Sequence, residues 1–289
     1  MRKLLAIPDG VILSLFPPGN LLNGRRSANE AWIRGLCSVA YLGNDTALCR
    51  SLGRFKMVVD TTDFGLAPHI MLDGYWEMWV TEVVARLVRP GMVVADIGAN
   101  LGYFTLLMAE LVGSAGRVHA FEPNPRMAEL LQRSLDINGL LGHTDLHQLA
   151  LGDVDGASLE LVVPANEPKN AHLQPLGDAP SPGSHVVQMV RLDSRPDWCQ
   201  IELAKIDVEG AEELVWAGAQ GLLDGDRLRT IILEFTPDRY ASAAVFLKRM
   251  LDAGFALARI DPWAGTVGCS AEELLDGDGR EDRMLLLTR

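Results

Sequence analysis

Several apolar segments of this sequence end at a turn, and an acidic residue occurs at the end of each of these segments. Carboxylates in such places can bind a cationic group, accept hydrogen bonds from a ligand or remove a proton. In an open parallel sheet, ligands bind beyond the carboxyl ends of the strands, where the order of winding reverses. We therefore expect one ligand site to gather the residues at these strand ends: Asp96, Glu122, Asp207, Glu209 and Glu234.

The segment 93–105 has the pattern of a strand, a tight turn and a helix, with Gly98 and Gly102 bracketing the turn. Such a turn lets a ligand approach bare amides at a helix N-terminus. Its glycines lack the G-x-G-x-x-G spacing of a dinucleotide site and the Lys-Ser/Thr pair of a P-loop. Asp96, just before the turn, would repel a diphosphate but suits an ammonium group. This end of the site is therefore predicted to hold an amino acid moiety.

Glu122 ends the next predicted strand, a position from which a carboxylate can accept hydrogen bonds from both hydroxyls of a ribose. The alternative is a helix-capping role before Pro123. A cofactor with a ribose at one end and a cationic amino acid at the other is S-adenosylmethionine.

The elements that must position these residues alternate between strand and helix, which predicts an α/β fold with a mainly parallel sheet covered on both faces. Two further strands at 158–163 and 186–192 flank a predicted long loop over 164–185, a place where lids and substrate loops occur. The other strands are predicted at 55–61, 93–95, 117–121, 145–151, 201–208, 230–235, 255–260 and 284–288, and helices at 28–42, 75–88, 211–223 and 243–251.

Residues 1–74 contain several Pro, Gly and Asn residues that interrupt helices and strands, and they lack the strand-helix alternation of the following sequence. They are predicted to form an N-terminal appendage that covers the substrate or contacts another subunit in a homo-oligomer. Residues 75–289 are predicted to form the cofactor-binding domain.

Composition narrows the class of partner. The chain has 289 residues, of which 48% are hydrophobic, and a net charge of -12, which disfavours nucleic acid or an anionic membrane as the main partner. Its four cysteines show no metal-binding or disulfide spacing, so we expect a reducing, cytoplasmic location. The sequence begins as a signal peptide might, but Pro8, Asp9 and Gly10 interrupt its apolar run. No apolar segment is long enough to span a bilayer.

Five motifs occur in order along the chain. They are Asp-Ile-Gly-Ala-Asn-Leu-Gly-Tyr-Phe-Thr (96–105), Phe-Glu-Pro-Asn-Pro (121–125), Ala-Leu-Gly-Asp (150–153), Lys-Ile-Asp-Val-Glu-Gly-Ala-Glu (205–212) and Ile-Leu-Glu (232–234). Together they resemble the FkbM family of class I S-adenosylmethionine-dependent methyltransferases. An upstream Gly-Tyr-Trp-Glu (74–77) is similar to the entrance motif of that family.

The resemblance implies a Rossmann-like, seven-stranded sheet whose last strand is antiparallel, and O-methylation of a sugar or polyketide-like small molecule. It implies that Glu122 holds the ribose and that Asp207 lies beside the transferred methyl. The methionine portion would be held by Asp96, Gly98, Ala99 and Asn100, and the adenine would be bordered by Ala150 and Leu151. The remaining cofactor-binding candidates are Glu77, Gly102, Tyr103 and Pro123.

A hydroxyl is a poor nucleophile, so a base is expected near the methyl group. Asp207 is the first candidate and Glu209 the second, because alternate residues of an extended segment share a face. Asp207 could instead orient the cofactor ammonium, and Glu209 could cap the following helix. His69 is a third candidate if the appendage closes over the site. Lys205 is predicted to form a structural salt bridge with Glu234 or Glu209.

Several alternatives stay open. Asp207 and Glu209 could bind a divalent cation, although none is expected as an obligatory cofactor. Within the enzymes, the methylated atom could be a nitrogen or a carboxylate oxygen, or the cofactor could rearrange without an acceptor. A nucleotide-dependent dehydrogenase and a non-catalytic cofactor-binding module are alternatives from other classes. The acceptor is expected to contact residues 1–75 and 164–185.

Overall fold

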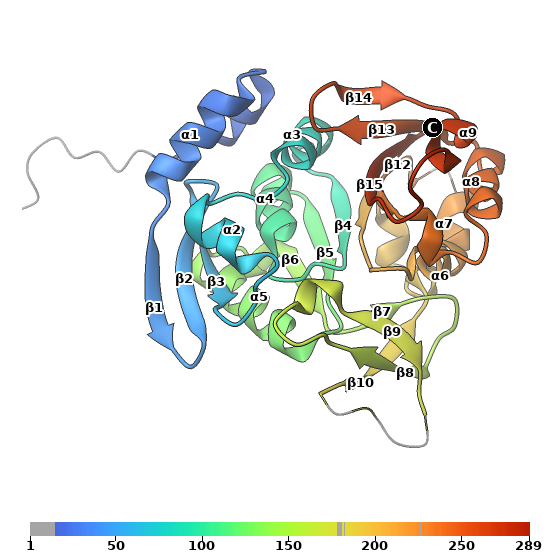
Figure 1. Ribbon diagram of the computed structural model, residues 1–289, viewed down its shortest axis with the longest axis horizontal. Helices are drawn as coiled ribbons and strands as arrows, with labels where there is room; N and C mark the ends of the chain where they lie inside the picture. Colours follow the sequence, from blue (N-terminus) through green and yellow to red (C-terminus); the bar gives the residue numbers. More distant parts are fainter. Residues whose placement is uncertain (1–14, 178–180, 182, 226) are drawn as a thin grey trace, which may run out of the picture.

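A central eight-stranded sheet organises the computed structural model, which describes residues 15–177, 181, 183–225 and 227–289 (Figure 1). The strand order is β14-β13-β15-β12-β11-β4-β5-β6. The strands are β4 (Val93–Ile97), β5 (Arg117–Phe121), β6 (Thr144–His147), β11 (Leu203–Ile206), β12 (Thr230–Phe235), β13 (Ala256–Asp261), β14 (Gly265–Gly268) and β15 (Arg283–Thr288).

The five strands from β12 to β6 run parallel, and β15 is antiparallel to both of its neighbours, β12 and β13. The predicted α/β class, with an antiparallel last strand, is confirmed. The sequence-based expectation of seven strands missed β14, which pairs with β13 through a tight turn.

Helices cover both faces of this sheet, because alternate strand residues point to opposite sides. In β4, Val94 belongs to one core, whereas Ala95 and Ile97 belong to the other. The first core is covered by α3 (Met78–Leu87), α4 (Tyr103–Val112) and α5 (Pro125–Ile137). The second is covered by α6 (Glu212–Gly218), α7 (Gln220–Asp224), α8 (Ala243–Asp252) and α9 (Ala271–Leu275).

The N-terminal elements pack beside α5 at the left of Figure 1. They comprise η1 (Pro18–Leu22), α1 (Arg26–Leu36), α2 (Ala67–Leu72) and a small antiparallel sheet of β1 (Val39–Gly43), β2 (Thr46–Ser51) and β3 (Phe55–Asp60). The Val58 amide donates to Ser134 Oγ at 2.9 Å, and Met57 shares a core with Leu131. Residues 1–14, part of the predicted subunit contact, lie outside the described residues.

Three predicted helices have different bounds in the structure. The helix predicted over 211–223 divides at Ala219 into α6 and α7. The helix predicted over 28–42 is wrong beyond Leu36, because Cys37 adopts an extended conformation and the chain then pairs as β1 with β2. The helix predicted from residue 75 begins at Met78, because Glu77 has a left-handed φ of 35°.

A second sheet of four strands, at the bottom of Figure 1, has the order β7-β10-β8-β9. Its strands are β7 (Ala150–Leu151), β8 (Ala157–Val162), β9 (His172–Pro175) and β10 (His185–Val190). The single strand predicted over 145–151 is therefore wrong, since it divides between β6 and β7 in different sheets. The region predicted as a loop over 164–185 contains η3 (Pro168–Asn170) and β9. The Phe64 amide donates to the Asn166 carbonyl at 2.7 Å, which ties this region to the N-terminal elements.

Among the helices that the structure describes, none combines the length and apolar character that crossing a bilayer requires.

Candidate active site

One cavity lies at the carboxyl ends of β4, β5, β11 and β12, and it collects most of the predicted site residues. Three others, Asp96, Gly102 and His69, do not line it. The predicted residues that line it are Glu77, Gly98, Ala99, Asn100, Tyr103, Glu122, Pro123, Ala150, Leu151, Asp207, Glu209 and Glu234.

The glycine turn leaves no room for side chains at either of its glycines. A Cβ at Gly98, whose φ is +81°, would lie 1.8 Å from the Asp207 carbonyl oxygen. A Cβ at Gly102, whose φ is +89°, would lie 2.1 Å from Leu131 Cδ1. Gly98 therefore allows the turn after β4 to lie close against the Asp207 carbonyl, whereas Gly102 allows α4 to pack against α5.

Asp96 is 1% exposed and lies in β4, directly before the turn. The Thr105 hydroxyl donates to its Oδ2 at 2.6 Å, while the buried Oδ1 has no hydrogen-bond partner among the described residues. Burial raises the pKa of Asp96, and the nearby Lys205 opposes that shift. A buried acceptor oxygen of this kind fits the ammonium of a bound amino acid moiety.

Glu122 follows β5 and is held by the backbone on two sides. The Asn100 amide donates to Oε2 at 2.7 Å, and the Asn124 amide donates to Oε1 at 2.8 Å. Burial raises the pKa of Glu122 to about 7, although both amides oppose the shift. Because each carboxylate oxygen has a second lone pair, the fixed carboxylate can also accept the hydroxyls of a ribose.

Lys205 and Asp207 form an ion pair at the end of β11. Lys205 Nζ lies 2.8 Å from Asp207 Oδ2, and the lysine side chain is 2% exposed. Burial lowers the pKa of Lys205, but Asp207 and Asp96 outweigh it and hold that pKa above its usual value. The predicted partner of Lys205, Glu234 or Glu209, is therefore corrected to Asp207.

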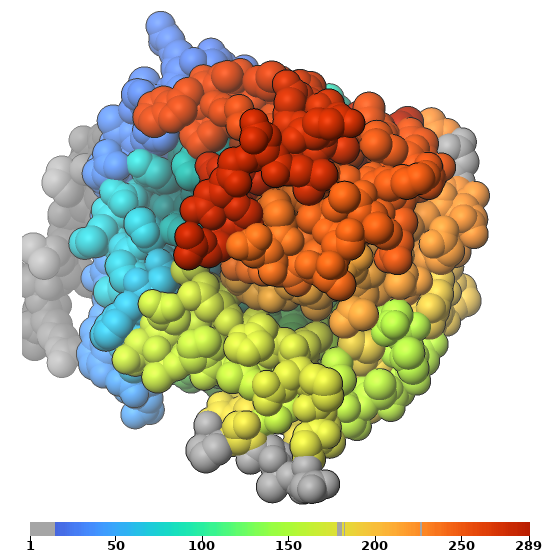
Figure 2. All heavy atoms as spheres, turned by 45° about the vertical axis from the view of Figure 1, so that its right-hand side comes forward, coloured from blue at the N-terminus to red at the C-terminus, as the bar shows by residue number. Residues whose placement is uncertain are grey.

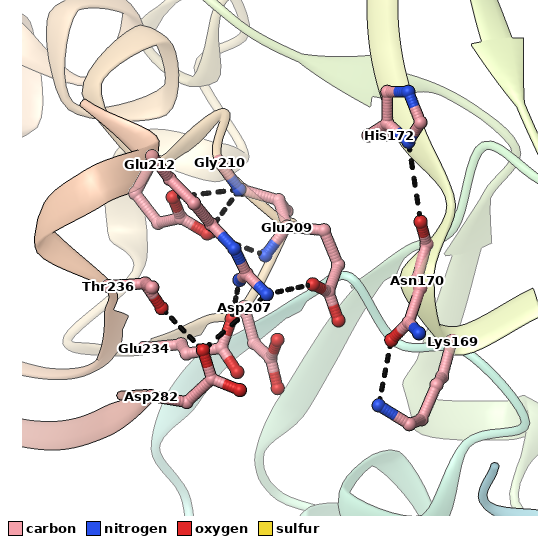
Figure 3. Close-up of polar contacts among 12 residues, drawn as sticks. Lys169, Asn170, His172, Asp207, Glu209, Gly210, Glu212, Glu234, Thr236 and Asp282 are labelled. Carbon is pink, nitrogen blue, oxygen red and sulfur yellow. Dashed lines mark hydrogen bonds and ion pairs between the residues drawn. The ribbon is translucent and has the colours of Figure 1, made fainter. Parts of the chain in front are cut away.

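Glu209, Glu234 and Asp282 gather at one side of the site (Figure 3), and Arg239, in η6 (Pro237–Arg239), forms ion pairs with all three. Its guanidinium lies 2.7 Å from Glu209, 2.6 Å from Glu234 and 3.5 Å from Asp282. Burial and then Asp207 raise the pKa of Glu209 to about 7 and that of Glu234 to about 10. Sequence reasoning missed Arg239, and its only signal was its place five residues after Glu234.

Oxygens of Asp207, Glu209 and Glu234 lie within 4.8 Å of one another, a spacing that could suit a metal ion. However, Lys205 contacts Asp207, and Arg239 contacts the other two carboxylates. The positive charges of Lys205 and Arg239 therefore already compensate the carboxylates that a divalent cation would otherwise neutralise.

Glu77 enters the cavity from the start of α3, where its left-handed backbone turns the chain into the helix. Burial and then Asp207 raise the pKa of Glu77 to about 7. Trp76 also lines the cavity. His69 is exposed instead, with its ring 4.9 Å from the Trp76 ring and its Nδ1 3.9 Å from Asp73, so the structure does not bring it together with the carboxylates.

Lys169, which sequence reasoning did not single out, reaches the cavity from η3. Its Nζ donates to Asn170 Oδ1 at 2.7 Å, and its methylenes leave no space for a Cβ at Gly65. In the sequence, Lys169 was covered only by the wider segment 164–185, in which acceptor contacts were expected. His185 pairs with Leu161 within the second sheet and is not part of the cavity lining.

Comparison with known proteins agrees with this geometry. A family model described as "Methyltransferase FkbM domain" matches residues 96–257. The 31-O-demethyl-FK506 methyltransferase FkbM of Streptomyces tacrolimicus is 31% identical over 176 residues, covering 51% of this chain and 66% of that protein. A protein-L-isoaspartate O-methyltransferase of Aeropyrum pernix is 42% identical over 65 residues, covering 21% of this chain and 25% of that protein. The chain thus spans less than two thirds of each of these relatives.

Among solved structures, a putative rRNA-methylase from Clostridium thermocellum overlaps 72% of this chain and 91% of its own. It has a TM-score of 0.45 and 13% sequence identity.

Proposed function

This chain belongs to the FkbM methyltransferase family and is an S-adenosylmethionine-dependent methyltransferase; from that premise we propose that it methylates a hydroxyl oxygen of a small molecule. The observation that carries the proposal is the row of carboxylates that line one cavity, Glu122, Asp207 and Glu209. Glu122 would hold the ribose, and Asp207 and Glu209 lie farther along the strand ends. Asp96, buried directly before the glycine turn and outside the lining, would receive the ammonium through its unpartnered oxygen.

When bound, the cofactor supplies an activated methyl group on a sulfonium. The chain must then align the acceptor oxygen and remove its proton. The amides around Glu122 and the turn at Gly98 are already fixed, so the ribose and methionine ends would be positioned without rearrangement of the backbone. Leu149, Ala150 and Leu151 offer an apolar border for the adenine.

We assign proton removal to the Asp207–Glu209 segment and favour Glu209 within it. Asp207 is engaged by the buried Lys205, a partner suited to fixing its position. Burial and then Asp207 raise the pKa of Glu209 to about 7, close to the value that makes a base effective at neutral pH. Its contact with Arg239 fixes its orientation. His69 stays a weaker candidate, because closure of the N-terminal elements would have to carry it to the methyl group.

Transfer of labelled methyl from S-adenosylmethionine, followed by mass spectrometry of the product, tests this proposal. Asp207→Ala should abolish transfer while the protein stays folded, and Glu209→Gln should slow transfer at least about a hundredfold. Glu129→Gln, an exposed change on α5, is the matched control and should leave the rate unchanged. Normal turnover in either site variant would remove that residue from the catalytic set. A product methylated on nitrogen or on a carboxylate would overturn O-methylation.

We further propose that the N-terminal elements act as a cover for the acceptor or as a subunit contact. The hydrogen bond from Phe64 to Asn166 supports the first role, because it joins them to the segment that carries Lys169. The net charge of -12 supports a small-molecule acceptor over nucleic acid, and the cysteine pattern supports a cytoplasmic location.

A further inference from the structure

The α-carboxylate of S-adenosylmethionine is an anionic group, and the residues assigned to the other parts of the cofactor leave it without a partner. Asp96 suits the ammonium, and Glu122 suits the ribose. The carboxylate must enter a cavity whose lining contains five acidic side chains, Glu77, Glu122, Asp207, Glu209 and Glu234. Like charges repel strongly in such a poorly solvated space, so the bound carboxylate requires a cation beside it.

The lining offers two cations, Lys205 and Lys169. Lys205 is 2% exposed, and its Nζ is already paired with Asp207 at 2.8 Å. Lys169 is half-buried, and its Nζ donates to the neutral amide oxygen of Asn170 at 2.7 Å. Within the described part of the chain, Lys169 forms no ion pair with a carboxylate. Because an ammonium carries more than one donor, Lys169 can still bind an anion.

The Lys169 ammonium acts at the end of the cavity where the methionine part of the cofactor is expected. Burial raises the pKa of Glu77 and of Glu209, and Lys169 is among the cations that oppose both shifts. In Figure 3, Lys169 lies across the site from Asp207 and Glu209. A carboxylate bound by Lys169 would therefore lie on the side of the cavity opposite the strand ends.

Contacts with the N-terminal elements hold the Lys169 side chain toward the cavity. A Cβ at Gly65 would lie 2.7 Å from Lys169 Cδ, so the glycine makes room for the lysine methylenes. The Phe64 amide donates to the Asn166 carbonyl at 2.7 Å, close to η3. Figure 2 shows the yellow-green surface of the η3–β9 region against the cyan surface of the N-terminal elements. A side chain that is already packed loses less freedom when it binds a ligand.

We propose that Lys169 binds the α-carboxylate of S-adenosylmethionine. Its Nζ donates to a carboxylate oxygen while it keeps the hydrogen bond to Asn170. This assignment concerns the cofactor and not the acceptor, so it does not depend on which atom is methylated.

Calorimetry of the full chain with two ligands tests the proposal. S-adenosylhomocysteine carries the carboxylate, whereas its decarboxylated analogue, S-adenosyl-3-thiopropylamine, keeps the ammonium but lacks the carboxylate. The wild type should bind S-adenosylhomocysteine about tenfold or more tightly than the analogue. Lys169→Met should remove most of this preference by weakening the binding of S-adenosylhomocysteine alone. Unchanged binding of the analogue shows that the variant is folded.

Two further variants complete the experiment. Lys169→Gln, which replaces the charge by a neutral amide, should lose the preference as Lys169→Met does. Lys248→Met, at an exposed lysine on α8, is the matched control and should keep it. The proposal is overturned if the wild type binds both ligands equally, or if both Lys169 variants keep the preference. It is also overturned if both variants weaken the two ligands to the same extent, because Lys169 would then have only a structural role.

Discussion

Replacing Lys205 by methionine tests whether the buried ion pair between Lys205 and Asp207 stabilises the protein. The buried ammonium of Lys205 lies 2.8 Å from Asp207 and 4.9 Å from the centre of the Phe104 ring. Methionine keeps much of the apolar length of the side chain but removes the charge. Asp207 and Asp96 would then lack their nearest cation, and the pKa of Asp96 would rise further above its usual value.

The size of the effect follows from burial. Removing one member of a buried ion pair costs about 3–5 kcal/mol of unfolding free energy, because the other charge is left uncompensated. The Asp207 side chain is 26% exposed, so water can solvate part of its charge. We therefore expect Lys205→Met to lower the free energy of unfolding by about 3 kcal/mol, the lower end of that range.

Urea unfolding followed by tryptophan fluorescence measures this loss at neutral pH. The double variant Lys205→Met/Asp207→Asn removes the uncompensated carboxylate and should recover at least about 1 kcal/mol relative to the single variant. A loss below about 1 kcal/mol in the single variant, or no recovery in the double variant, would refute the assigned role of this pair.

Three further predictions concern the cofactor, the base and the metal. Glu122→Ala should weaken S-adenosylmethionine binding by about 1.5–3 kcal/mol in calorimetry, because hydrogen bonds to a charged group are lost, and unchanged affinity would contradict the ribose assignment. Since burial and then Asp207 raise the pKa of Glu209 to about 7, kcat/KM should fall as the pH drops below 7 and level off above it; a flat profile between about pH 5.5 and 8 would exclude Glu209 as the base. Dialysis against EDTA should leave activity intact, because Arg239 and Lys205 already contact the carboxylate cluster, and a loss that Mg²⁺ reverses would point to a metal site.

The parts of the site that were predictable from sequence depend on local chain geometry. Gly98 must be glycine because the turn brings it against the Asp207 carbonyl, and the strand before it ends in a short, recognisable pattern. Glu122 directly follows a strand, so its place at the sheet edge followed from the βα order.

The residues that were missed depend on contacts between distant segments. Arg239 matters because η6 carries it against Glu209 and Glu234, which no spacing in the sequence reveals. Lys169 reaches the cavity from η3, a segment that contacts with Phe64 and Gly65 tie to the N-terminal elements. The helix predicted over 28–42 failed for a similar reason, since pairing of β1 with β2 outweighs the helical pattern after Leu36.

A crystal structure of the complex with S-adenosylhomocysteine tests the central claim most directly. We predict that both ribose hydroxyls lie within hydrogen-bond distance of the Glu122 carboxylate, that the amino group lies near Asp96, and that the sulfur faces the Asp207–Glu209 segment. A ligand whose ribose does not contact Glu122, or whose sulfur points away from Asp207 and Glu209, would contradict the account.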